Sequence, residues 1–234
     1  MGTLTLSVDT TSRRGGVCLL ADARVLCELN IDAGLTFSEK LLEMIDFLFR
    51  VSGVTLDEVD LLAVSTGPGS FTGLRVGIAT MKALALRLER PLIGVTTLEA
   101  LVAGVSDTGV VAAFMDARRN QVFAALFEKS SADALPVVIR EGEASAPFEW
   151  IASLTHRAVR FVGDGTLPYR SLIEAAGHSV ARSDFFVARE VAAIARHRLV
   201  QGAVPPLHLL DAYYIRPADA EMSAVGRAAR RRAG

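Results

Sequence analysis

Short apolar segments separated by polar turns dominate the first third of the chain, and this pattern predicts strands. Helical spacing follows, in which apolar residues recur every three or four positions. Four strands are predicted in the first half, at residues 4–8, 16–20, 25–31 and 59–65. Two long helices are predicted there as well, at residues 38–50 and 74–88. A mixture of strands and helices in this order indicates an α/β protein.

The second half of the chain begins like the first. A strand at residues 110–115, a polar turn that starts at Asp116, and a strand at residues 122–127 repeat the earlier strand, Asp9 turn and strand. The offset is about one hundred residues, and both turns carry adjacent arginines. Later elements are predicted as helices at residues 147–154, 167–176 and 187–200 and a strand at residues 159–162. The sequence therefore predicts a duplicated lobe.

The boundary between the lobes is predicted at a short connecting helix. Thr96 and Glu99 form a capping-box pattern at its start, and Gly104 marks its end. We therefore expect an N-terminal lobe at residues 1–104 and a C-terminal lobe at residues 105–220, followed by an arginine-rich tail at residues 221–234.

Composition and charge narrow the classes of protein. Of 234 residues, 51% are hydrophobic and 22% are charged, and no apolar stretch approaches the roughly 18 residues of a membrane span. The N-terminus lacks the pattern of a secretory signal, so we expect a cytoplasmic protein without a membrane partner. The formal net charge is −1 although four arginines lie in the last eight residues, so the preceding body is acidic. An acidic body predicts that any RNA is held mainly by a partner.

A glycine-rich loop, Gly67 to Gly73, is the strongest local signal for binding. A loop that leads into a helix N-terminus presents backbone N–H groups to an anion, which makes Gly67, Gly69 and Ser70 candidate phosphate or nucleotide contacts. The loop matches neither a Walker A motif nor a dinucleotide fingerprint. The alternative is a tight turn in which Ser70 or Thr72 caps the helix.

The first polar turn is the second candidate. Asp9 and Thr10 follow the first strand, in a turn that is similar to the Asp-x-Gly-Thr phosphate turn of the actin and Hsp70 ATPases. Thr11 occupies the glycine position, where a side chain opposes close approach of a phosphate, so independent ATP hydrolysis is not expected. The four histidines lack the spacing of three or four that makes a metal-binding helix face, and neither a metal site nor a catalytic centre is predicted.

The two long helices of the first lobe are apolar over more than one face. One face fits the sheet, and a second face is available for a partner chain or for internal packing. The residues predicted to contact a partner are Leu41, Met44, Ile45, Leu74, Ile78, Met81, Lys82 and Ala85. On this prediction, an arginine at Ile78 or Met81 would abolish pairing and leave the lobe folded.

Residues 64–77, Val-Ser-Thr-Gly-Pro-Gly-Ser-Phe-Thr-Gly-Leu-Arg-Val-Gly, resemble the signature of the TsaB (YeaZ) family, which acts in forming threonylcarbamoyladenosine in bacterial tRNA. Further matches lie across nearly the whole chain, at Asp9-Thr10 and at residues 94–98, 115–119, 122–123 and 214–217. The resemblance implies an ASKHA fold, the fold of actin and Hsp70, with two duplicated lobes of which the second is reduced.

The resemblance also implies a role as a non-catalytic subunit. Its partners would be the catalytic paralogue TsaD, which modifies tRNAs that read codons beginning with adenine, and the ATPase TsaE. The tRNA would be contacted indirectly. TsaD-like proteins carry a His-x-x-x-His metal pair where this chain has Phe37 and Leu41. No cofactor of its own is expected, and ATP or ADP at a subunit interface stays open, as does a homodimer of the isolated chain.

Two other functional classes remain open. A stand-alone homodimeric scaffold would use the same helices, and only the identity of the bound chain separates it from a TsaD partner. A weak ASKHA ATPase would need a competent Asp9 turn, which an ATP-turnover assay would reveal.

Overall fold

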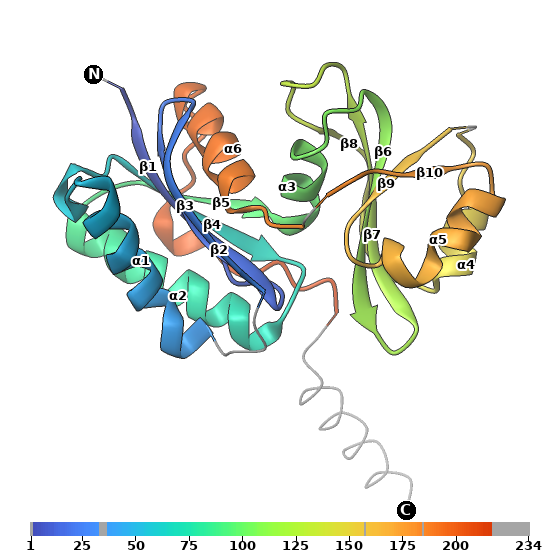
Figure 1. Cartoon of the computed structure of the whole chain (residues 1–234), viewed down its shortest axis with the longest axis horizontal. Helices are drawn as coiled ribbons and strands as arrows, with labels where there is room; N and C mark the ends of the chain where they lie inside the picture. Colours follow the sequence, from blue (N-terminus) through green and yellow to red (C-terminus); the bar gives the residue numbers. More distant parts are fainter. Residues whose placement is uncertain (1, 33–36, 157, 184, 217–234) are drawn as a thin grey trace, which may run out of the picture.

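Two five-stranded mixed sheets form the framework of the computed structural model, which describes residues 2–32, 37–156, 158–183 and 185–216 (Figure 1). The first sheet has the order β3-β2-β1-β4-β5 and consists of β1 (Leu4–Asp9), β2 (Arg14–Ala21), β3 (Arg24–Asp32), β4 (Leu61–Gly67) and β5 (Leu92–Thr96). The second has the order β10-β9-β6-β7-β8 and consists of β6 (Gly109–Arg118), β7 (Gln121–Lys129), β8 (Val137–Ser145), β9 (Arg160–Val162) and β10 (Ser179–Val180).

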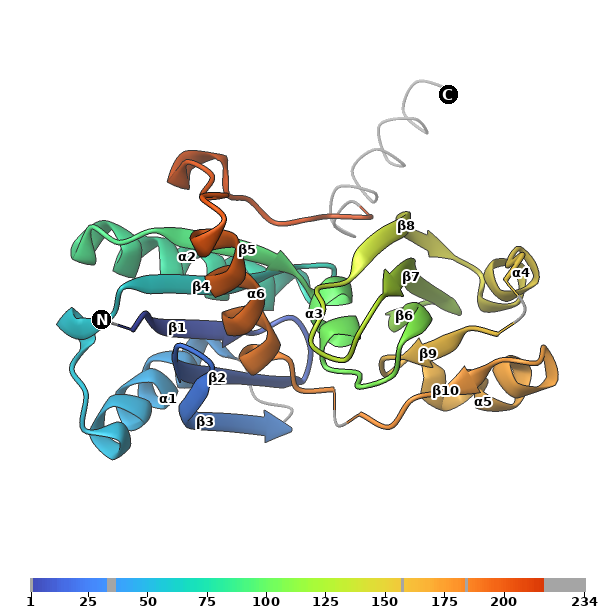
Figure 2. The ribbon, with the colours of Figure 1, turned by 90° about the horizontal axis from the view of Figure 1, so that it is seen from above.

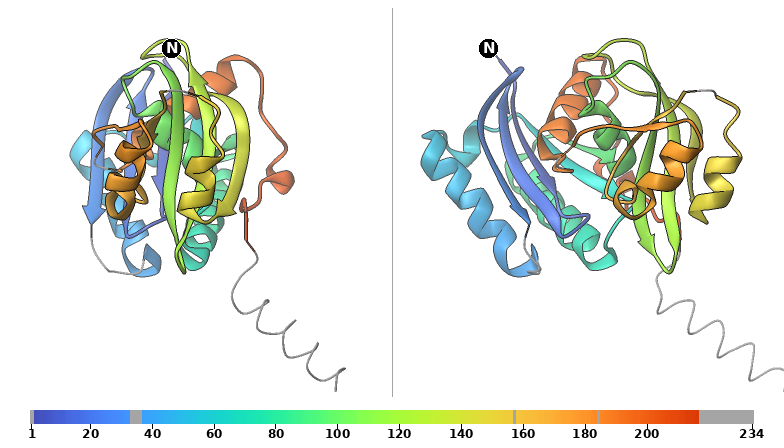
Figure 3. Two further views of the ribbon diagram at one scale, coloured as in Figure 1. Left: turned by 90° about the vertical axis from the view of Figure 1, so that its right-hand side faces the viewer. Right: turned by 45° about the vertical axis from the view of Figure 1, so that its right-hand side comes forward.

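In the described part of the chain, six helices cover these sheets in three layers (Figures 1 and 3). They are α1 (Phe37–Ser52), α2 (Phe71–Leu88), α3 (Thr97–Ala103), α4 (Pro147–Ala152), α5 (Thr166–Ala175) and α6 (Ala188–Val200). Helices α1 and α2 lie on the outer face of the first sheet, and α4 and α5 lie on the outer face of the second. Helices α3 and α6 lie between the two sheets. Short 3-10 turns occur at Leu56–Glu58 and Leu207–Leu209.

The two lobes repeat one topology. In each, three antiparallel strands are followed by a helix, a strand parallel to the first, a second helix, another parallel strand and a third helix. The second lobe is smaller, because β9 has three residues and β10 has two. The predicted ASKHA fold with two duplicated lobes and a reduced second lobe is confirmed.

The last helix of each lobe crosses to the other lobe. Helix α6 packs on β1, β2 and β4 of the first sheet, whereas α3 packs on β6 and β7 of the second sheet and also touches β4 and β5 of its own (Figure 2). Residues from both sheets and both helices form one continuous apolar core. Arg198 of α6 donates to both carboxylate oxygens of Glu99 of α3 at 2.8 and 2.7 Å, and it also donates to the carbonyl of Gly94. The two helices thereby join the lobes through apolar packing and hydrogen bonds.

Because the helices are exchanged, the two predicted lobes do not have separate cores. Helix α6 lies within the range expected for the C-terminal lobe, yet it contributes to the core of the first sheet. The division at residue 104 stays a prediction of where the repeat begins, since one core spans both halves. The arginine-rich tail at residues 221–234 lies outside the described residues.

Edge strands and helix starts differ most from the sequence pattern. Strands β5, β8 and β10 were not predicted, because β8 is an exposed edge that carries charged residues and β10 is too short to give a pattern. Helix α2 begins at Phe71 rather than residue 74, with Ser70 as its N-cap. Within the described residues, no helix combines the length and the apolar character that crossing a membrane requires.

The shared core predicts that the two lobes unfold as one unit. Ile194 of α6 is fully buried between the sheets, so Ile194→Ala should lower the free energy of unfolding by about 2–5 kcal/mol. Urea denaturation should show one transition by circular dichroism and by fluorescence of Trp150, the single tryptophan, which lies in the second lobe. The exposed Val200→Ala should change stability by less than about 0.5 kcal/mol. Separate transitions for the two signals would contradict the shared core.

Candidate functional site

The turn after β1 is pressed against one face of helix α2. Gly73 and Gly77 are four residues apart and share that face, and Gly69 lies in the loop just before the helix. A Cβ atom at any of them would approach Thr10 or Thr11 to under 3.0 Å. The hydroxyl of Thr10 donates to the carbonyl of Gly73 at 2.7 Å. The glycines of the loop and helix therefore provide the space in which the Thr10–Thr11 turn lies.

The loop that leads into α2 is held by hydrogen bonds within the chain. The backbone N–H of Ser70 donates to the carbonyl of Thr11 at 2.6 Å, and the hydroxyl of Ser70 accepts from the N–H of Gly73 at 3.3 Å. Gly67 has a φ of +111°, which a side chain would oppose. The capping role of Ser70 is confirmed. That Gly67, Gly69 and Ser70 bind an anion stays a prediction.

Asp9 lies beneath the turn and is almost fully buried. One of its carboxylate oxygens, Oδ1, accepts from the backbone N–H of Thr11 at 3.1 Å and from the Thr11 hydroxyl at 2.7 Å. Burial raises the pKa of the Asp9 carboxyl, and the hydrogen bonds from Thr11 offset part of that rise. Thr11 thus occupies the position at which a glycine would let a phosphate approach the backbone. Its backbone N–H and its hydroxyl both donate to Asp9.

The equivalent turn of the second lobe faces the first across a cleft. Asp116 Oδ1 accepts from the backbone N–H of Arg118 at 2.8 Å, which repeats the bond from Thr11 to Asp9. The N–H of Asp116 donates to Asp164 Oδ1 at 3.0 Å. Burial raises the pKa of the Asp164 carboxyl, and the neighbouring charge of Asp116 raises it further. The duplication thus extends to single hydrogen bonds at the cleft.

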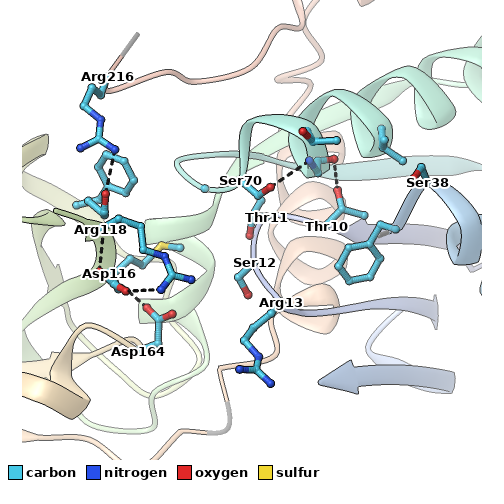
Figure 4. A pocket seen from close by; sticks show the side chains of 18 residues that line it. Thr10, Thr11, Ser12, Arg13, Ser38, Ser70, Asp116, Arg118, Asp164 and Arg216 are labelled. Atoms are coloured by element: carbon cyan, nitrogen blue, oxygen red, sulfur yellow. Dashed lines mark hydrogen bonds and ion pairs between the residues drawn. The ribbon is translucent and has the colours of Figure 1, made fainter. Parts of the chain in front are cut away.

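Two adjoining cavities, of about 400 and 340 Å³, occupy the cleft between the lobes (Figure 4). The larger cavity is lined by both turns, by the start of α2 and by Arg216. Thr10, Gly69 and Ser70 line this cavity, and Asp9 lines the smaller one, but Gly67 lines neither. The structure thus brings most of the predicted anion-binding residues to one cleft.

Several cleft residues were missed by the sequence reasoning. Ser38, Thr72, Asp164 and Arg216 line the larger cavity. Asp164 had a signal in the sequence, because it lies between Gly163 and Gly165 directly after the strand predicted at residues 159–162. Arg216 belongs to the matched segment at residues 214–217, but only the folded chain brings it near the turns.

The segment from Leu210 to Arg216 forms a strap across both lobes. Leu210 is buried in the core of the first lobe, and the N–H of Tyr213 donates to the carbonyl of Thr66 at 2.7 Å. Arg216 then reaches the second lobe, where it donates to the Gln121 side chain and to the carbonyl of Ala117, both at 3.0 Å. The strap thereby closes one side of the cleft.

Most residues predicted to contact a partner lie inside this chain. Seven of the eight are buried: Leu41, Met44, Ile45, Leu74, Ile78, Met81 and Ala85. Most of them belong to the core beneath α1 and α2, and only Lys82 reaches the surface. An arginine at Ile78 or Met81 would therefore disrupt the fold, contrary to the expectation that the lobe stays folded. The second apolar face of these helices therefore packs largely against other parts of this chain.

A different set of apolar side chains points outward from the same helices. These are Leu42, Phe47 and Val51 of α1 and Leu86 of α2, which are 65%, 42%, 59% and 69% exposed. Ala79 and Ala83 of α2 are exposed as well. Because α1 and α2 lie side by side on one face of the sheet, these residues are on the outward surface of that layer. We call this set the outer helix face.

The position of a metal pair in TsaD-like proteins is occupied here by apolar packing. Phe37 and Leu41 are both buried, and the Phe37 ring lies against Gly15. The described residues contain no group of three or more metal-binding side chains. A hydrophobic contact thus fills the place that the resemblance assigns to metal ligands.

The close contact between α2 and the turn predicts strong coupling between Gly77 and Thr10. Gly77→Ala should destabilise the protein by roughly 1–3 kcal/mol, because its methyl group would overlap the Thr10 hydroxyl. In a Thr10→Ala background the same change should cost at least about 1 kcal/mol less, as measured by urea unfolding in a double-mutant cycle. Gly104→Ala serves as the control, because its nearest neighbours would be in ordinary contact. Additive effects at Gly77 and Thr10 would exclude the contact as the cause.

The raised pKa of Asp9 predicts a pH-dependent stability. A carboxyl with a raised folded-state pKa stabilises the fold at low pH, and that contribution is lost as the pH rises through the folded value. Asp9→Asn keeps an acceptor for Thr11 and does not titrate, so its stability relative to the wild type should increase from pH 5 to pH 8 in urea unfolding. Asp32→Asn is the control and should differ from the wild type by a constant amount over this range, because the hydrogen bond from Arg14 lowers the pKa of Asp32 and moves its titration to lower pH. A constant difference between Asp9→Asn and wild type would contradict the assignment.

Comparison with known proteins agrees with the fold and the motifs. A family model described as TsaD, tRNA N6-adenosine threonylcarbamoyltransferase, matches residues 32–193. The chain is 31% identical over 160 residues to the tRNA threonylcarbamoyladenosine biosynthesis protein TsaB of Escherichia coli, covering 62% of this chain and 68% of that protein. It is 29% identical over 172 residues to the TsaB protein of Bacillus subtilis, covering 72% and 74%.

A solved structure described as YeaZ from Pseudomonas aeruginosa superposes with a TM-score of 0.77 at 22% identity, covering 91% of this chain and 99% of that one. At this identity the superposition shows the shared fold. The family is shown by the sequence matches, which include most of both lobes. The chain belongs to the TsaB family.

Proposed function

We propose that this chain is a non-catalytic subunit in the biosynthesis of threonylcarbamoyladenosine in tRNA. It would bind a TsaD-type transferase and support modification of tRNAs that read codons beginning with adenine. The outer helix face carries this proposal, because it offers exposed apolar side chains on two adjacent helices. Family membership supplies the pathway.

The geometry of the cleft supports a role without chemistry of its own. Thr11 directs both its backbone N–H and its hydroxyl to Asp9, so neither donor faces a phosphate. The space beside Gly69, Gly73 and Gly77 of the signature is occupied by the Thr10–Thr11 turn. These glycines therefore allow β1 and α2 to pack closely.

The outer helix face fits a protein partner better than a small ligand. Leu42 and Leu86 are more than half exposed, and charged residues such as Glu43 and Arg87 lie beside them in the sequence of each helix. Apolar anchors surrounded by polar side chains are the usual composition of a protein interface. A TsaE-type ATPase would join the complex through other surfaces, and ATP or ADP would bind at a subunit boundary.

Substitution on the outer helix face should weaken the complex and spare the fold. Leu86→Arg places a charge in an apolar contact, so we expect at least about tenfold weaker binding to the TsaD-type paralogue of the same cell. Isothermal titration calorimetry measures the affinity, and circular dichroism checks the fold. Phe148→Arg is a matched control, because Phe148 is 68% exposed but lies in α4 of the second lobe.

Depletion of the chain should lower the threonylcarbamoyladenosine content of tRNA, and Leu86→Arg should fail to restore it where Phe148→Arg succeeds. Self-association through the same face, with no TsaD-type partner and unaltered tRNA, would favour the homodimeric scaffold. ATP turnover by the purified chain would favour the ASKHA ATPase.

A further inference from the structure

Charge is divided unequally between the two helices that carry the outer helix face. Helix α2 contains three basic side chains and no acidic one, which gives it a formal charge of +3. Helix α1 contains three acidic and two basic side chains, which gives it a formal charge of −1. The basic residues of α2 are Arg75, Lys82 and Arg87, and the charged residues of α1 are Glu39, Lys40, Glu43, Asp46 and Arg50. Positive charge is therefore concentrated on α2.

Most charges of α1 are paired within that helix. Lys40 pairs with Glu43, and Arg50 pairs with Asp46, both at 2.9 Å. Spacings of three and four residues place these side chains on neighbouring turns. In the described part of the chain, no ion pair joins α1 to α2. The acidic side chains of α1 are thus engaged mainly by the bases of α1 itself.

The bases of α2 have no acidic partner in this chain. Among the described residues, none of its three basic side chains forms an ion pair. The guanidinium carbon of Arg75 lies 3.8 Å from the centre of the Phe71 ring, a contact that leaves its positive charge in place. Glu89 caps the end of the helix, and Arg90 follows it directly, so the end of α2 gains no net negative charge. The charge of α2 is therefore available to a partner.

These bases lie around an apolar strip on α2. Ala79, Ala83 and Leu86 are exposed, and spacings of four and three residues place them on one side of the helix. Each of the three bases lies three or four residues from one of the two alanines. The short alanine side chains keep the bases within reach of any surface that covers the strip. An apolar centre with a charged rim is typical of a protein interface, and here the rim has a single sign.

A second copy of this chain would neutralise α2 poorly. Two identical chains usually meet through a two-fold interface, in which the same surface of each copy takes part. On the outer helix face, α2 of one copy would then meet either α2 or α1 of the other. The first arrangement brings a charge of +3 against +3, and in the second the charge of −1 on α1 offsets only part of it. Like charges across an interface disfavour that pairing.

We propose that α2 binds an acidic surface of the TsaD-type partner, and that its unpaired positive charge selects this partner over a second copy of the chain. This inference rests on the proposed function and adds the chemistry of the partner surface. That surface carries aspartate or glutamate opposite Arg75, Lys82 and Arg87, around an apolar contact with Ala79 and Ala83. Charge complementarity of this kind fixes partner choice and accelerates association.

The test is the affinity for the TsaD-type paralogue, measured by isothermal titration calorimetry between about 50 and 500 mM salt. Lys82→Glu/Arg87→Glu should weaken binding at least about tenfold at low salt and less than about threefold at high salt, because salt screens exposed charges. The neutral Lys82→Gln/Arg87→Gln should lose an intermediate amount. The control is Arg170→Glu/Arg182→Glu, which changes the net charge equally at exposed positions of the second lobe. Circular dichroism checks the fold of each variant.

Selection against a second copy is tested by sedimentation equilibrium of the isolated wild-type chain. At about 50 mM salt, self-association should be at least about tenfold weaker than partner binding, because the charges of α2 are then least screened. Self-association as tight as partner binding would overturn the selection.

A salt-dependent loss in the α2 variants with an unchanged control supports the proposal. An equal loss in the control, or partner binding that neither salt nor reversal of the α2 charges alters, overturns it and leaves the proposed function intact, since the complex still forms. If the wild-type chain does not bind the paralogue at any salt concentration, the proposed function itself fails.

Discussion

The exchange of helices α3 and α6 between the lobes is the constraint on which the rest of the structure depends. Each helix is the last element of one repeat and packs on the sheet of the other, so one apolar core fills the space between the sheets. Arg198 and Glu99 join the two helices within that core. Lys129 of β7 adds a contact by donating to the carbonyls of Ala103 and Val105, at the end of α3 and the start of the second lobe. The distance between the two turns is thereby fixed.

The cleft follows from this arrangement. The Asp9 turn and the Asp116 turn are copies of one motif, and the shared core places them opposite each other. The two turns differ in how far their side chains are buried. In the first, Asp9 is buried and Thr10 and Thr11 are packed against the glycines of α2, which makes the turn part of the core. In the second, Arg118 extends into solvent. Packing against the Thr10–Thr11 turn thus explains the glycines at positions 69, 73 and 77 of the family signature.

Much of the fold could be predicted from the sequence, because apolar spacing and the repeat of an aspartate turn with two arginines are local signals. A cap by Ser70 or Thr72 was one of two alternatives for the glycine-rich loop, and the structure confirms the cap at Ser70. Strand β8 and the strap to Arg216 escaped prediction, since an exposed edge and an irregular segment leave no periodic pattern. The buried residues Ile78 and Met81 show the main limit: periodicity identifies an apolar face, but it does not tell whether the chain itself or a partner covers that face.

Our proposal is that the outer helix face of α1 and α2 binds a TsaD-type partner. The most direct test is hydrogen exchange of the chain with and without the TsaD-type paralogue, read by mass spectrometry. The account predicts slower exchange in peptides from α1 and α2, with α4 and α5 unchanged. Protection confined to the second lobe, with α1 and α2 exchanging as in the free chain, would contradict it.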